Sequence, residues 1–117
     1  MRNQPKYNLF KNTGYALSGL KDIVKNERSF QIELICIVIL IPIIFIIEQP
    51  LTCKIIMFLS LMGVLIAEII NSAIERVVDL VTLEHNEMAG RAKDIGSAIV
   101  LFSIITSFIT WIIILLH

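Results

Sequence analysis

Charged residues are scarce in this sequence and make up 17% of its 117 residues, whereas a soluble domain carries about 25%. The charges also balance, with 10 lysines and arginines against 10 aspartates and glutamates, so no strongly basic field indicates a nucleic-acid partner. Hydrophobic residues account for 56% of the chain, which excludes a disordered protein. The composition therefore predicts one integral-membrane domain over residues 1–117.

Cysteine and the familiar soluble-enzyme motifs are also missing or rare. The two cysteines, Cys36 and Cys53, lie in or beside apolar runs, and no Cys-x-x-Cys or Cys/His spacing indicates zinc or a redox pair. Gly14 and Gly19 have the spacing of a phosphate-binding loop, but Leu20 stands where that motif needs lysine. Residues 1–15 lack the apolar core of a signal peptide. We therefore expect the internal apolar segments to insert the chain into the membrane.

Three apolar runs are present, and a helix needs about 20 residues to cross the hydrocarbon core. The third run reaches that length without help, and the first reaches it if the helix starts near residue 29, with Glu33 near the interface. The second must continue past Glu68, which places acidic side chains at membrane depth. The sequence thus predicts an all-α membrane protein with spans at about 29–48, 53–80 and 92–116.

An amphipathic segment precedes the first span. At the helical period its apolar residues form one stripe, flanked by lysines, that consists of Leu9, Phe10, Thr13, Leu17, Leu20 and Val24. We expect a surface helix at about 6–26 that lies in the headgroup region, the alternative being a frayed polar tail. Tyr15 lies on the polar side of this helix. There it either contacts a polar ligand or anchors the helix at the membrane interface.

Basic residues determine the expected orientation. They are concentrated before the first span and around the loop between the second and third spans, and none follows the third. The positive-inside rule places both of those regions, including the N-terminus, in the cytoplasm.

The second span carries a polar stripe. At 100° per residue one face collects Glu68, Asn71, Ser72, Glu75 and Asp79, with Arg76 at its margin. A charge at mid-membrane costs at least ~2.5–3.5 kcal/mol, and Arg76 can balance one acid at most. Cations from elsewhere, or Mg²⁺ bound by carboxylates and phosphates, would compensate the rest. The structural alternative is a packing stripe of protonated acids.

The third span begins with further polar residues. Lys93 and Asp94 stand at its cytoplasmic entrance, on the same side as the end of the stripe. Together with magnesium and acids, they indicate that a phosphate-bearing soluble molecule is handled at the membrane surface. Arg91 and Lys93 can alternatively be interpreted as basic residues that only anchor the cytoplasmic end of the span. His85 can likewise be interpreted as a solvated loop residue without a functional role.

Three segments of the sequence strongly resemble the small bacterial diacylglycerol kinases. They are Glu-Arg-Ser-Phe at 27–30, Glu-Ile-Ile-Asn-Ser-Ala-Ile-Glu-Arg-Val-Val-Asp at 68–79, and the run at 84–98 that contains Gly-Arg-Ala-Lys-Asp. The resemblance extends from Gly14 to Trp111. It implies a homotrimer in the bacterial inner membrane, with active sites shared between chains. It also implies transfer of the γ-phosphate of MgATP to diacylglycerol, giving phosphatidate.

The resemblance further implies residue roles. Glu68 corresponds to the general base, and Glu27 and Glu75 to ligands of the metal and nucleotide. The remaining ATP-binding positions are Tyr15, Glu84, His85, Asn86, Lys93 and Asp94. Lipid-side positions are Glu33, Glu68, Ser97 and Trp111, and Asn71 and Asp79 support the site. Asn8 and Ala16 depart from the arginine and serine of well-known relatives, and Lys6 or Lys11 would have to replace the lost charge.

Three alternatives remain at this stage. The same fold acts on undecaprenol in related kinases of Gram-positive bacteria, although the run Gly-Arg-Ala-Lys-Asp-Ile-Gly-Ser-Ala resembles the diacylglycerol enzymes more closely. A small proton-coupled transporter would use Glu68 as a relay but leaves Glu27 and Lys93 without a role. A purely structural membrane subunit leaves the whole stripe unexplained.

Overall fold

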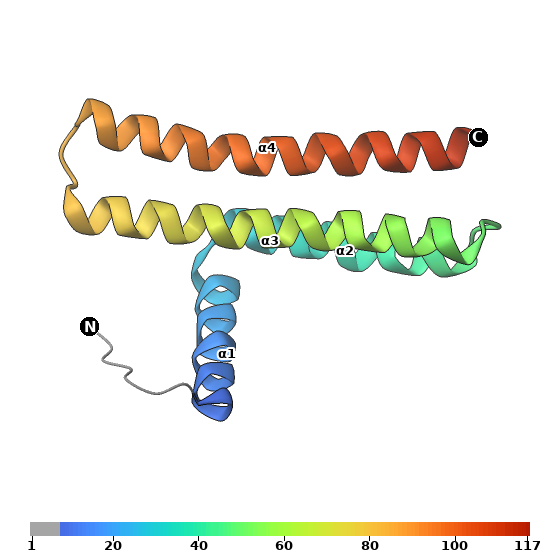
Figure 1. The fold of residues 1–117 in the computed structure, drawn as a ribbon, viewed down its shortest axis with the longest axis horizontal. Helices are drawn as coiled ribbons and strands as arrows, with labels where there is room; N and C mark the ends of the chain where they lie inside the picture. The colour runs from blue at the N-terminus through green and yellow to red at the C-terminus, as the bar shows by residue number, and fades with distance from the viewer. Residues whose placement is uncertain (1–7) are drawn as a thin grey trace.

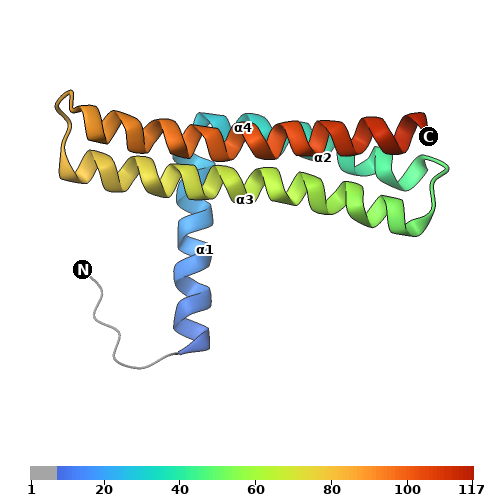
Figure 2. The same cartoon turned by 45° about the horizontal axis from the view of Figure 1, so that its top comes forward.

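A computed structural model describes residues 8–117 as four α-helices joined by short connections. They are α1 (Leu9–Asn26), α2 (Arg28–Ile46), α3 (Leu51–Val81) and α4 (Glu87–Leu116). The helices α2, α3 and α4 run alongside one another, and α1 stands out to one side across their direction (Figure 1). A view turned by 45° shows the same arrangement (Figure 2). The expected all-α architecture is confirmed.

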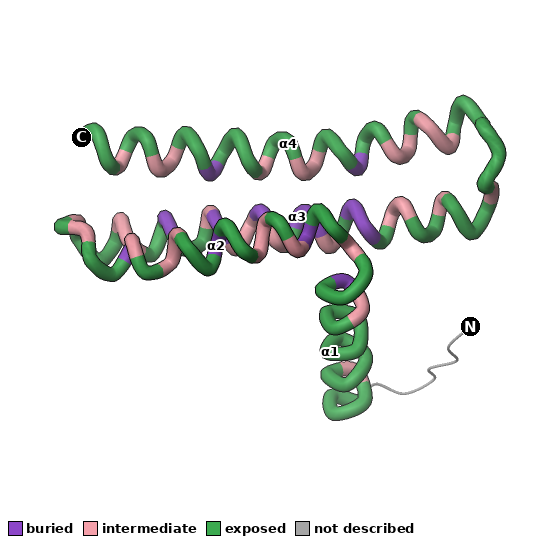
Figure 3. The backbone as a smooth tube through the Cα atoms, turned by 180° about the vertical axis from the view of Figure 1, so that it is seen from behind, coloured by how far each residue is buried: buried purple, intermediate pink, exposed green. Residues whose placement is uncertain are grey.

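The three long helices have the properties of membrane spans. An 18-residue stretch in each of them has a mean hydropathy of 2.6, 2.2 and 2.7, respectively, and each helix is long enough to cross a bilayer. Many large apolar residues of these helices are exposed, and green, the colour of exposed residues, covers much of each long helix (Figure 3). A surface of this kind is stable in lipid rather than in water, so the three predicted spans are present as helices.

The helix α3 forms the centre of the bundle because it packs against both α2 and α4. A small core of Ile37, Ile44, Met57 and Leu61 joins α2 to α3. Polar contacts add to the packing of α3 on α4: Trp111 Nε1 donates to the Met57 carbonyl at 3.3 Å, and the hydroxyls of Ser60 and Ser107 lie 3.0 Å apart. These contacts fix the register of α4 along α3.

Side-chain caps account for two helix starts. The Asn8 side chain accepts from the Lys11 amide at 3.1 Å, so α1 begins at Leu9; the start expected near residue 6, and Lys6 itself, lie outside the described residues. The Asn86 side chain accepts from the Ala89 amide at 3.0 Å. This cap starts α4 at Glu87, before the span expected from about residue 92.

The corner between α1 and α2 is a single residue. Glu27 has an extended backbone, with φ −106° and ψ 109°, and separates the last residue of α1 from the first of α2. Gln31 Nε2 donates to the carbonyls of Val24 and Lys25 at 2.8 and 3.2 Å, which satisfies carbonyls that the end of α1 leaves without helical partners. The corner thus places the Glu27 side chain beside the middle of α3.

Candidate functional site

The polar stripe of α3 runs from the interior of the bundle to its surface. Glu68, Asn71 and Ser72 are buried, Glu75 is half-buried and Asp79 is exposed. The helical period therefore places these side chains on one face, as their spacing predicts. Burial decreases toward the end of α3 that joins the loop to α4, so the stripe opens at that end.

Glu33 of α2 lies against the buried end of the stripe. Its carboxyl group is close enough to that of Glu68 for the two to interact, and Glu33 Oε2 is buried without a hydrogen-bond partner among the described residues. Glu27 and Glu75 are also near enough to Glu68 to act on it electrostatically. Three carboxyl groups, from α2, α3 and the α1–α2 corner, thus lie near that of Glu68.

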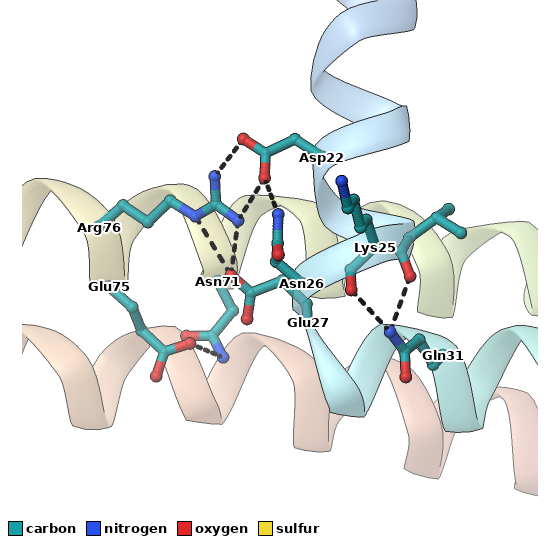
Figure 4. A network of polar contacts seen from close by, with 9 residues as sticks. Asp22, Lys25, Asn26, Glu27, Gln31, Asn71, Glu75 and Arg76 are labelled. Atoms are coloured by element: carbon teal, nitrogen blue, oxygen red, sulfur yellow. Dashed lines mark hydrogen bonds and ion pairs between the residues drawn. The ribbon is translucent and has the colours of Figure 1, made fainter.

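The sequence places Arg76 at the margin of the stripe, where it could balance one acid at most. Within residues 8–117 it forms no ion pair with a stripe acid. It pairs instead with acids at the α1–α2 corner: Arg76 Nη1 lies 2.7 Å from Asp22 Oδ2, and Arg76 Nη2 lies 2.8 Å from Glu27 Oε1 (Figure 4). We call Asp22, Glu27 and Arg76 the corner cluster. The Arg76 guanidinium, with help from the Asn26 amide, lowers the pKa of Asp22 below its ordinary value.

Asn71 links the stripe to α4. Its Nδ2 donates to Glu75 Oε1 at 3.4 Å, a long hydrogen bond. Its Oδ1 is buried without a partner among the described residues and faces Gly96, where an added Cβ would collide with it. The absence of a side chain at Gly96 thus lets α4 approach α3 at the level of Asn71.

The open end of the stripe meets α4 and the preceding loop. Lys93 Nζ lies 2.6 Å from Asp79 Oδ1, so one cation from outside α3 does reach the stripe. A cavity of about 340 Å³ lies beside this pair, lined by residues that include Glu84, His85, Asn86 and Lys93. The structure therefore brings four of the expected nucleotide-binding residues together at one mouth.

A second, apolar groove of about 450 Å³ lies between α2 and α4, with α3 beneath it. Most of its lining is apolar, the exceptions being Glu33, Cys36 and Ser107. Trp111, expected on the lipid side, lines this groove together with Glu33. The groove can take a hydrocarbon chain and brings it to the carboxyl group that interacts with Glu68.

Eight expected site residues line neither cavity in the described part of the chain. Five of them belong to the stripe or to the α1–α2 corner, namely Glu27, Glu68, Asn71, Glu75 and Asp79, and the other three are exposed elsewhere. Tyr15 is exposed on α1, and Asp94 and Ser97 are exposed on α4. Conversely, Asp22 and Gly96 were missed by the sequence analysis. No spacing links Asp22 to Arg76 or Gly96 to Asn71, because each pair joins different helices.

The carboxylates offer oxygen ligands of the kind that Mg²⁺ prefers. Within residues 8–117, no group of three or more His, Cys, Asp or Glu side chains could by itself hold a metal ion. Mg²⁺ commonly uses one or two carboxylates together with substrate phosphates, and the unpartnered Asn71 Oδ1 is a further oxygen donor nearby. The residues thus fit a metal that arrives with a phosphate-bearing substrate.

Comparison with known proteins gives a consistent family. The model of the family described as prokaryotic diacylglycerol kinase matches residues 14–115. The chain is 40% identical to the diacylglycerol kinase of Escherichia coli K12 over 107 residues, which cover 92% of this chain and 88% of that protein. It is 41% identical to the diacylglycerol kinase of Haemophilus influenzae over 88% of this chain and 87% of that protein. It is 32% identical to the undecaprenol kinase of Bacillus subtilis over 86% and 82% of the two chains.

Proposed function

The chain belongs to the prokaryotic diacylglycerol kinase family, and we propose that it transfers the γ-phosphate of MgATP to the hydroxyl of diacylglycerol, giving phosphatidate. The observation that carries the proposal is the meeting of an apolar groove with the polar stripe, where the carboxyl groups of Glu33 and Glu68 interact. A lipid alcohol has a hydrocarbon part and a reactive hydroxyl, and the two regions match these two parts.

Glu68 is the residue that we propose as general base. It is buried where the stripe begins, next to the end of the groove that holds Glu33. A carboxylate within hydrogen-bond reach of the lipid hydroxyl can accept its proton as the oxygen attacks phosphorus. Glu33 and Trp111 would orient the lipid from the walls of the groove, and Ser97 remains a lipid-side proposal without support from the groove lining.

The nucleotide is proposed to enter from the mouth near Lys93. Four residues line the cavity there, namely Glu84, His85, Asn86 and Lys93. Glu75 stands between Asp79 and Glu68 along the stripe, and Glu27 is near enough to Glu68 to act on it electrostatically. Mg²⁺, when bound by Glu27 and Glu75, would neutralise charge on the phosphates. Lys93 would add positive charge beside them, which Asp79 keeps in place. Tyr15 and Asp94 belong to the same proposed nucleotide set.

The position of α1 supports the orientation that we propose. Its exposed apolar residues include Leu9, Phe10 and Leu17, and it meets the long helices beside α3, away from the ends of that helix (Figure 1). If α1 lies in the headgroup layer, the last turns of α3 and the first turns of α4 extend beyond the bilayer. We propose that this extension is in the cytoplasm of a bacterial inner membrane, where ATP is available.

We also propose that the protein works as a homotrimer with sites between chains. The stripe reaches the surface at Glu75 and Asp79, and cyclic association would cover it. Lys93 contacts Asp79, which lies about 16 Å farther along α3 than Glu68 at 1.5 Å per residue. Glu68 and Lys93 are therefore far apart within one chain. This separation supports an active site in which the two residues come from different chains.

One assay tests the reaction and the substrate together. The purified protein in mixed micelles is given labelled ATP and either diacylglycerol or undecaprenol. We expect faster labelling of diacylglycerol, in keeping with the higher identity to the diacylglycerol kinases. Equal or faster labelling of undecaprenol would favour the second candidate, which the undecaprenol kinase relative supports. If neither lipid alcohol is labelled, the proposed kinase activity is rejected, and the proton-coupled transporter becomes the favoured alternative.

A further inference from the structure

Arg76 has an unusual position for a residue of the polar stripe region. It belongs to α3, yet the four hydrogen bonds that its side chain makes within residues 8–117 go to Asp22 and Glu27, at the α1–α2 corner. Nε and Nη2 donate to Glu27 Oε1 at 3.1 and 2.8 Å, and Nη1 and Nη2 donate to Asp22 at 2.7 and 3.3 Å. One planar guanidinium thus holds two carboxylates from two sides (Figure 4).

The corner has few other ties. Among the residues of α1, Ile23 is buried, and the rest of the helix extends away from the bundle (Figure 2). Gln31 of α2 donates to the carbonyls of Val24 and Lys25, but these bonds join α1 to α2 and do not reach the Glu27 side chain. Within residues 8–117, the hydrogen bonds and ion pairs that tie the end of α1 and the Glu27 carboxylate to α3 come from Arg76.

The contacts also leave Glu27 able to bind something else. Both bonds from Arg76 go to Oε1, and within residues 8–117 no hydrogen bond or ion pair to Oε2 is present. The cluster has two acids and one base, so a negative charge remains after pairing. A carboxylate fixed by one oxygen and open at the other can accept a cation.

We propose that Arg76 is a positioning residue for the phosphoryl transfer: it moors the end of α1 to α3 through Asp22 and fixes the Glu27 carboxylate for the magnesium-bound nucleotide. This inference rests on the proposed function, which makes Glu27 a ligand of the metal and nucleotide. Arg76 acts through Glu27 and does not touch the reacting atoms. The competing interpretation is direct contact between Arg76 and a phosphate group.

The first experiment measures kcat and KM for MgATP and for diacylglycerol in mixed micelles. Arg76→Ala should lower kcat/KM for MgATP about ten- to hundredfold, since a misplacement of about 1 Å costs about 10²-fold, while KM for the lipid stays within about twofold. Arg28→Ala removes a neighbouring exposed arginine and should stay near wild type. An effect of Arg76→Ala no larger than that of Arg28→Ala would overturn the proposal.

A double-mutant cycle separates positioning from direct contact. In a Glu27→Gln background, Arg76→Ala should add less than about threefold, because its partner is already lost. Losses that multiply fully would assign Arg76 to the phosphates and reject the proposal. Arg76→Lys keeps the charge but not the fork, so it should recover only part of the activity. Full recovery by lysine would attribute the effect to charge alone.

The second experiment does not depend on activity. Amide hydrogen exchange of residues 17–27, measured in micelles without nucleotide, should be faster in Arg76→Ala and Asp22→Asn than in wild type and Arg28→Ala. Unchanged exchange would reject the mooring of α1. If the wild-type protein phosphorylates no lipid alcohol, the proposed function fails, while the exchange measurement still decides whether Arg76 holds the corner.

Discussion

Gly96 of α4 lies directly against the side-chain oxygen of Asn71 of α3, so closely that a β-carbon at Gly96 would collide with it. The Asn71 amide in turn donates to Glu75. The lack of a side chain at one position of α4 therefore determines the place of a polar group in the stripe. This relationship makes the distance between two helices part of the geometry of the site.

Gly96→Ala should displace Asn71 and so disturb Glu75. We expect a loss of stability of about 1–3 kcal/mol from overpacking and a fall in kcat of about tenfold. Thermal unfolding in detergent and steady-state assays measure the two effects. Gly63→Ala is the matched control, because a β-carbon there meets nothing within 4 Å. Equal behaviour of the two variants would show that the contact with Asn71 has no consequence.

Glu68→Gln should lower kcat by about 10²-fold or more and leave MgATP affinity nearly unchanged, since a general base acts only in the transition state. Equilibrium binding of MgATP, together with turnover, measures the split. Glu48→Gln, an exposed acid beyond the opposite end of α2, should resemble wild type. Weak nucleotide binding with normal turnover would instead assign Glu68 to the nucleotide site.

Glu75→Gln keeps the shape of the side chain and removes a negative ligand. We expect the magnesium concentration for half-maximal activity to rise, and activity to fall by about 10²-fold, because a neutral amide is a poorer ligand for a hard cation. A magnesium titration at fixed ATP measures both. A titration that matches wild type would exclude Glu75 as a ligand.

Glu68→Gln and Lys93→Ala should complement each other if sites form between chains. The two inactive variants are unfolded, mixed in equal amounts and reassembled, with mixed oligomers verified by cross-linking. Random mixing with two donor chains per site gives both intact residues to about a quarter of the sites. Activity near that fraction supports the shared site, whereas no recovery in verified mixed oligomers places both residues within one chain.

The helices and the stripe were predictable because both depend on local periodicity. Hydropathy located the three spans, and the spacing of Glu68, Asn71 and Asp79 placed them on one face. Helix caps are local features too. The Asn86 side chain caps α4, so the helix begins at Glu87, in a polar segment that we had assigned to the loop.

The partners across helices were not predictable in the same way. Arg76 lies at the margin of the stripe in sequence, but the position of α1 gives it Asp22 and Glu27 instead. The interaction of Glu33 with Glu68 likewise depends on how α2 is rotated against α3. Spacing along the chain is enough to predict which residues share a helix face, because the backbone hydrogen bonds set 3.6 residues per turn. Which faces meet depends on the packing of the helices. Their relative shift and rotation arise from contacts such as that of Gly96 with Asn71, and no spacing along the chain encodes these contacts.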